Sequence, residues 1–113
     1  MSTNELLYRI MQNRDSIPVG ISVLDAVKQV TGYGAEVLKS RSRKREHVEA
    51  RQIAMYFYIR NGVYTKRAGE VVGRDHATAI HAKRRIQELY GQKSERVLTE
   101  MVDKVSDLTG IRL

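Results

Sequence analysis

One short stretch of the sequence, residues 53–59, is apolar almost all the way round when it is placed on a helix. It reads Ile-Ala-Met-Tyr-Phe-Tyr-Ile, within a segment that runs from about Glu46 to Asn61 and stops at Gly62. A helix without a polar face is stable only where neighbouring elements cover it on every side. The sequence therefore predicts one central helix with the rest of the 113 residues packed around it.

The other apolar residues also recur at helical spacing, and no stretch alternates as a strand does. We therefore expect an all-α fold, a helical bundle with further helices flanking it at both ends. Residues 17–20, Ile-Pro-Val-Gly, interrupt helix and set residues 1–17 apart as an N-terminal helical appendage. Residues 94–113 form a last helix capped by Ser94, whose apolar stripe either packs on the domain or forms a homodimer contact.

Side chains that cap helices mark where three further helices begin. Ser22 precedes one, Thr65 precedes a short one, and Asp75 precedes a longer one that ends at Tyr90. Between the last two lies a tight turn at Gly73–Arg74. A short helix, a glycine-containing turn and a longer basic helix are the outline of a helix-turn-helix.

The positive charge of the chain is concentrated in two short segments. Lys and Arg number 20 against 13 Asp and Glu, a formal net charge of +7. Residues 39–51 contribute +4 and residues 74–85 contribute +3, so the rest of the chain is neutral. Either segment alone is typical of a solvated helix face or loop, but both together favour a phosphate backbone. We expect double-stranded DNA as the partner, rather than an anionic membrane surface.

The absence of several residue patterns disfavours other functions. The chain has no cysteine, which removes disulfides, thiolate zinc sites and cysteine nucleophiles. His76 and His81 stand ~140° apart on a helix, whereas helical zinc pairs use a four-residue step. We therefore expect no metal site, no cofactor and no enzymatic activity. The first residues carry no signal-peptide pattern, so we expect a cytoplasmic protein.

The helix that follows Asp75 has one apolar side and one polar side. His76 and Thr78, in its first turn, can donate to base edges or phosphates. Asp75 can accept from a cytosine amino group or simply cap the helix, and Ala77 offers only apolar contact. The basic loop before the central helix, residues 40–45, is expected to be mobile. Its arginines either enter a narrow minor groove or attract phosphate without sequence preference.

Two motifs of the chain together resemble one family. They are Ser40-Arg-Ser-Arg-Lys-Arg-Glu-His-Val-Glu-Ala-Arg-Gln-Ile-Ala-Met55 and Gly73-Arg-Asp-His-Ala-Thr-Ala-Ile-His-Ala82. In content, order and spacing they are similar to the C-terminal DNA-binding domain of the bacterial chromosomal replication initiator DnaA. The resemblance covers residues 21–91. It implies a Trp-repressor-like helix-turn-helix that binds short duplex sites, in a cytoplasmic, nucleoid-associated protein of bacterial or phage origin.

The resemblance also implies a role for individual residues. Arg43 reads the minor groove, and Arg51 with Gln52 holds backbone phosphate. The tip residues read bases in the major groove, and Thr78 and His81 contact the backbone. The full set of expected DNA contacts is Arg43, Arg45, Arg51, Gln52, Arg74, Asp75, His76, Ala77, Thr78, His81, Arg84 and Arg85.

Three features depart from the family pattern. Ala77 stands where the family has a hydroxyl residue, and one good base contact is worth about 1–3 kcal/mol of discrimination. Thr65–Lys66 replaces Leu-Pro, and the motif Gly-x-x-x-x-Gly-Lys-[Ser/Thr] is absent. We therefore expect a freestanding reader of a different DNA site, without its own ATPase, in replication or transcription control. The alternative is a protein-interaction module that keeps the fold and uses its flanking helices on a partner.

Overall fold

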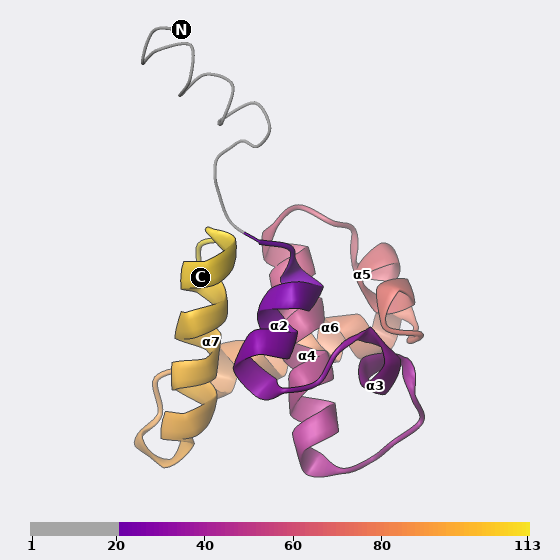
Figure 1. Ribbon diagram of the computed structural model, residues 1–113. Coiled ribbons are helices and arrows are strands. Elements are labelled where there is room, and N and C mark those ends of the chain that lie inside the picture. The colour runs from indigo at the N-terminus through magenta and orange to yellow at the C-terminus, as the bar shows by residue number, and fades with distance from the viewer. Residues whose placement is uncertain (1–20) are drawn as a thin grey trace, which may run out of the picture.

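The computed structural model describes residues 21–113, and Figure 1 shows that the regular elements of this part are all helices. The elements are α2 (Val23–Thr31), α3 (Ala35–Lys39), α4 (Arg45–Arg60), α5 (Thr65–Val71), α6 (His76–Leu89), the 3-10 turn η1 (Lys93–Glu95) and α7 (Arg96–Thr109). No strand occurs in residues 21–113. The all-α prediction is confirmed, whereas the predicted N-terminal helix, residues 1–17, lies outside the described residues.

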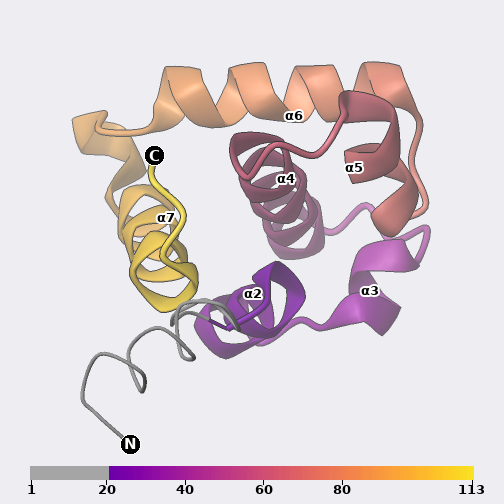
Figure 2. The same ribbon diagram turned by 90° about the horizontal axis from the view of Figure 1, so that it is seen from above.

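Helix α4 forms the centre of the molecule. Figure 2 views it nearly end-on, with the other helices arranged around it. Residues 50–57 of α4 are all buried, and Phe57, Ile53 and Met55 are among the largest side chains without solvent contact. The central apolar helix predicted from residues 53–59 is therefore confirmed, because a helix that is apolar on all sides needs partners on all sides.

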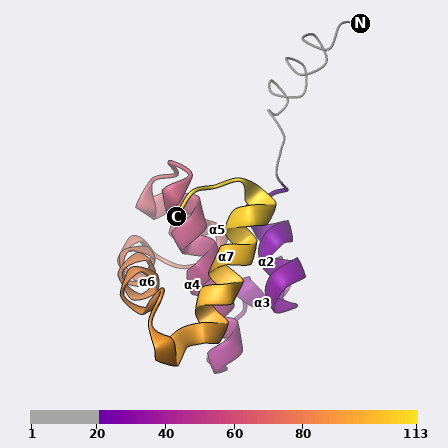
Figure 3. The same ribbon diagram turned by 90° about the vertical axis from the view of Figure 1, so that its left-hand side faces the viewer.

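Helix α7 packs alongside α2, as Figures 1 and 3 show. Leu98, Val102 and Val105 of its apolar stripe are buried. The segment before α2 is bonded to the C-terminal part of α7, because the Ile21 N–H donates to the Leu108 carbonyl at 2.9 Å. The stripe is thus used within the domain, and a homodimer contact through α7 stays a prediction. The predicted cap by Ser94 is wrong, because η1 precedes α7.

Helices α5 and α6 meet at the turn of the helix-turn-helix, and Gly69 permits their close approach. A Cβ atom on Gly69 would lie 2.6 Å from the Asp75 carbonyl oxygen and 2.8 Å from that of Arg74. The Arg74 N–H also donates to the Gly69 carbonyl at 2.8 Å. Gly73 takes the left-handed conformation with φ +70°, which glycine adopts without strain. The turn therefore depends on backbone contacts that a side chain would block.

Helix α6 runs across α4 from the α5 side to the α7 side of the molecule (Figure 2). Ala79, Ala82 and Ile86 face the core and are buried. The polar side of the helix is left at the surface, with its N-terminal end beside α5. Among the described helices, none is both long and apolar enough to cross a membrane.

Candidate nucleic-acid interface

The start of α6, residues 75–78, is called the α6 tip. Asp75 is the N-cap of α6, and its Oδ1 accepts from the Thr78 N–H at 2.8 Å. Hydrogen bonds from Thr78 lower the pKa of the Asp75 carboxyl from its usual value, because they stabilise the charged form. The capping role predicted for Asp75 is confirmed.

A side-chain bond joins the α6 tip to the start of α5. The Nδ1 atom of His76 lies 2.9 Å from Oγ1 of Thr65. His76 itself is exposed and Thr65 is half-buried. Thr65 was expected to cap α5, but that expectation is wrong: the N-cap is Tyr64, and its side chain makes no capping bond. The Thr65 hydroxyl is directed to the imidazole instead.

The other predicted contact residues of α6 are accessible to a ligand. Ala77, His81 and Arg84 are exposed, and Thr78 and Arg85 are half-buried. The three exposed residues stand on the side of the helix opposite to its buried alanines, and the two half-buried residues stand at the flank. The polar side of α6 predicted from the sequence is therefore at the surface, and the tip is not covered by any described part of the chain.

The basic loop, residues 40–45, is held from beneath by Arg51. This residue is only 5% exposed. Its Nε donates to the Leu38 carbonyl at 2.6 Å, and its Nη2 donates to the carbonyls of Ser40 and Ser42, each at 3.2 Å. One planar guanidinium thus fixes three backbone oxygens at the start of the loop, which a single ammonium group cannot match in geometry.

A second guanidinium converges on the same loop. Arg74 donates from Nη2 to the Ser40 carbonyl at 2.7 Å and from Nη1 to the carbonyls of Val72 and Gly73. It therefore ties the turn of the helix-turn-helix to the loop, 34 residues away in sequence. Burial, together with the nearby charge of Arg74, lowers the pKa of Arg51 from its usual value.

Polar side chains complete the framework of the loop. The Ser42 Oγ accepts from the Lys44 N–H at 3.2 Å and lies 2.7 Å from Nδ1 of His47. The His47 ring packs edge-on against Tyr33, with centroids 4.5 Å apart. The Ser42 N–H in turn donates to Oγ of Ser40 at 3.3 Å. The loop was expected to be mobile, yet its backbone is hydrogen-bonded at every second residue, Ser40, Ser42 and Lys44.

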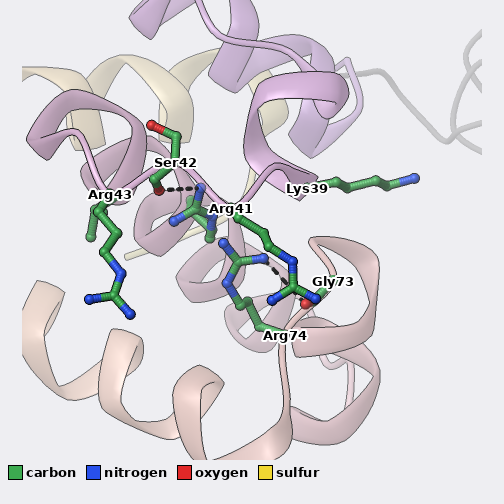
Figure 4. Close-up of a pocket in the computed structure, with 8 residues that line it drawn as sticks. Lys39, Arg41, Ser42, Arg43, Gly73 and Arg74 are labelled. Atoms are coloured by element: carbon green, nitrogen blue, oxygen red, sulfur yellow. Dashed lines mark hydrogen bonds between the residues drawn. The ribbon is translucent and has the colours of Figure 1, made fainter.

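Between the loop and the turn lies a hollow of about 550 Å³, called the cationic hollow. Its lining is Lys39, Arg41, Ser42, Arg43, Val48, Arg51, Gly73 and Arg74. Figure 4 shows Arg41 and Arg43 from the loop and Arg74 from the turn around this space, whereas the Lys39 side chain extends away from them. No acidic residue lines it. The hollow therefore brings Arg74, the first residue of the second basic segment, beside the basic loop.

Three residues predicted to contact DNA are placed differently from the rest. Arg51 is buried and its described hydrogen bonds serve the loop, although it lines the cationic hollow. Gln52 is 9% exposed, lies outside that lining, and its Oε1 has no partner in the described residues. The surroundings of Arg51 and Gln52 therefore disfavour direct phosphate contact by either residue. Arg45 pairs with Glu49 at 3.4 Å and borders a different groove.

Sequence reasoning missed one glycine and two side-chain pairs that shape this surface. Gly69 has no signal beyond being a glycine inside a helical segment, which indicates a close backbone approach. The Thr65–His76 and Ser42–His47 pairs join residues 11 and 5 apart, and neither spacing is a regular helical one. In residues 21–113, no cluster of three or more His, Cys, Asp or Glu side chains could hold a metal ion.

Comparison with known proteins agrees with this geometry. The family model described as bacterial dnaA protein helix-turn-helix matches residues 21–86, which is more than half of the chain. The matched segment contains the basic loop, α4, the turn and most of α6. The chain therefore belongs to the bacterial DnaA helix-turn-helix family.

Individual relatives give the same result. The chain is 40% identical over 76 residues to the chromosomal replication initiator protein DnaA of Flavobacterium psychrophilum, covering 63% of this chain and 15% of that protein. It is 33% identical over 87 residues to the chromosomal replication initiator protein DnaA of Picosynechococcus sp., covering 75% of this chain and 19% of that protein. It is 30% identical over 92 residues to the chromosomal replication initiator protein DnaA 1 of Chlamydia pneumoniae, covering 80% of this chain and 20% of that protein. The chain thus spans a fifth or less of each of these relatives.

Proposed function

We propose that this chain binds double-stranded DNA in a sequence-specific way. The α6 tip enters the major groove, and the basic loop lies along the backbone with Arg43 in the adjacent minor groove. The observation that carries the proposal is the cationic hollow, because it joins the basic loop to Arg74, directly before the exposed start of α6. Phosphates are the ligand that such a surface, basic and without acidic residues, attracts most strongly.

The accessible residues divide into two kinds of contact. Asp75, His76 and Ala77 stand at the exposed tip, where short side chains let the helix approach base edges. Thr78, His81, Arg84 and Arg85 lie further along α6 and are suited to phosphate. In the loop, Arg43 is exposed, whereas Arg51 and Arg74 shape the surface from behind.

The biological setting that we propose is control of replication. The relatives named above are replication initiator proteins, and the family match supplies the support for this setting. Control of transcription uses the same kind of surface. Because the match lies in the helix-turn-helix, no ATP-dependent step is assigned to this chain.

Selection of bound sequences from a random duplex pool at physiological salt tests the proposal. We expect one preferred site, with an affinity that falls steeply as salt rises. Replacing Arg43 or His76 by Ala should weaken the preferred site by about tenfold, the effect of one good base contact, and random duplex much less. Lys104→Ala on α7 is the control and should change neither. Equal losses on both duplexes would contradict specific recognition.

A further inference from the structure

We propose that Thr65 is a positioning residue for base recognition: its hydroxyl holds Nδ1 of His76, so that Nε2 faces the duplex as a hydrogen-bond donor. The inference rests on the proposed function and adds a specificity-determining residue to it. The observation behind it is the 2.9 Å contact between Thr65 Oγ1 and His76 Nδ1, which joins the first residues of α5 and α6.

The contact restricts an otherwise free imidazole. His76 is exposed, and in residues 21–113 no other side chain is hydrogen-bonded to its ring. Turning the ring over would give up the bond to Thr65, so the bond favours a single orientation. In the proposed arrangement the Thr65 hydroxyl donates to Nδ1, so the neutral ring carries its proton on Nε2. The 2.9 Å distance identifies the two atoms, and the measurement below assigns the proton.

A donor at this place complements what the neighbouring residue offers. Asp75 has a carboxylate oxygen that can only accept, whereas most base-edge atoms of the major groove are acceptors. His76 Nε2–H supplies the matching donor, and Ala77 supplies none. The position of Thr65 is also stable, because Gly69 fixes the distance between α5 and the α6 tip.

Removal of the hydroxyl at constant shape tests the role of Thr65. Thr65→Val should reduce discrimination between the preferred duplex and single-base variants by about fivefold, the effect of one neutral hydrogen bond. Thr65→Ser should restore it. The slope of affinity against salt should stay unchanged, because no phosphate contact is lost. Thr99→Val is the matched control, because it removes a hydroxyl of α7 that accepts from the Gly91 N–H, beyond the end of α6 away from the tip.

A spectroscopic measurement without DNA separates this inference from the proposed function. Nitrogen-15 shifts of the imidazole, assigned with His76→Ala, should show the proton on Nε2 in the wild type and a mixture of tautomers in Thr65→Val. Thr65→Val should also add nothing in a His76→Ala background. A wild-type ring that is already a mixture, or a salt slope that changes with Thr65→Val, overturns the inference. Absence of duplex binding by the wild type overturns the proposed function instead.

Discussion

The basic loop and the α6 tip are two neighbouring parts of one surface, but they are held in different ways. The loop is fixed by side chains, since Arg51 and Arg74 both donate to its Ser40 carbonyl and His47 contacts Ser42. The tip is fixed by the close backbone approach at Gly69 together with two short-range side-chain bonds, the cap formed by Asp75 and the contact between Thr65 and His76.

This difference shows where each part is vulnerable. The loop is held by the charged side chains of Arg51 and Arg74, and no carboxylate lines the hollow beside them. These two arginines therefore both order the loop and add to the positive potential around the exposed Arg43. The tip depends first on the close packing at Gly69, so a larger residue there should cost more than the loss of its exposed cap, Asp75. Three substitutions test this contrast, from the largest expected effect to the smallest.

Arg51→Met should have the largest effect. The stem is kept, but the carbonyls of Leu38 and Ser42 lose their described side-chain donor, while Ser40 keeps Arg74. We expect the free energy of unfolding to fall by about 2–4 kcal/mol, measured by urea denaturation. The free energy of unfolding of Arg51→Lys should lie between those of the wild type and Arg51→Met, because one ammonium cannot bond three oxygens in this geometry. A loss below about 0.5 kcal/mol, the scale of an ordinary surface change, would show that the loop does not need its guanidinium.

Gly69→Ala should have the next largest effect on the free energy of unfolding. Helix propensity and the close approach at Gly69 predict changes of opposite sign, so the sign separates them. Helix propensity alone predicts that alanine stabilises α5 by roughly 0.5–1 kcal/mol. The new Cβ would instead meet two backbone carbonyls that cannot rotate away, so we expect destabilisation by about 1–3 kcal/mol. Duplex affinity should fall with it, because the tip moves. Glu70→Ala, an exposed neighbour in the same helix, is the control, and stabilisation by both changes would refute the close approach.

Asp75→Ala should have the smallest effect and depend on pH. Loss of an N-cap should lower Tm by roughly 5 °C at pH 7. The pKa of Asp75 is lower in the folded state, so the cap stabilises above the unfolded pKa of about 3.9 and loses its effect as pH falls below it. The difference in Tm between the wild type and Asp75→Ala should therefore disappear in acid. Asp75→Asn, which still caps, should stay near the wild type at neutral pH.

Much of the fold could be predicted from the sequence because the strongest signals are local. The apolar run of residues 53–59 required a covered helix, and the caps at Ser22 and Asp75 gave the starts of α2 and α6. The predictions failed at Thr65 and Ser94, where a residue able to cap is used for another contact or lies within η1. A cap is chosen by backbone geometry at the helix end, which composition alone does not determine.

The candidate site could be predicted in outline but not in its supports. Charge clustering indicated the two basic segments, and the helical wheel indicated the exposed side of α6. The burial of Arg51 and Gln52 could not be predicted, because it depends on how α4 packs beneath the loop. The contact between Ser40 and Arg74 joins residues 34 apart, a distance that no local pattern encodes.

The anchored backbone of residues 40–45 has a kinetic consequence. A segment that is already ordered gives up little conformational entropy when a ligand arrives. We therefore expect the chain to associate with duplex in one rapid phase accelerated by long-range attraction and slowed by added salt. An arm that folds only on contact would show a second, slower phase that is independent of concentration.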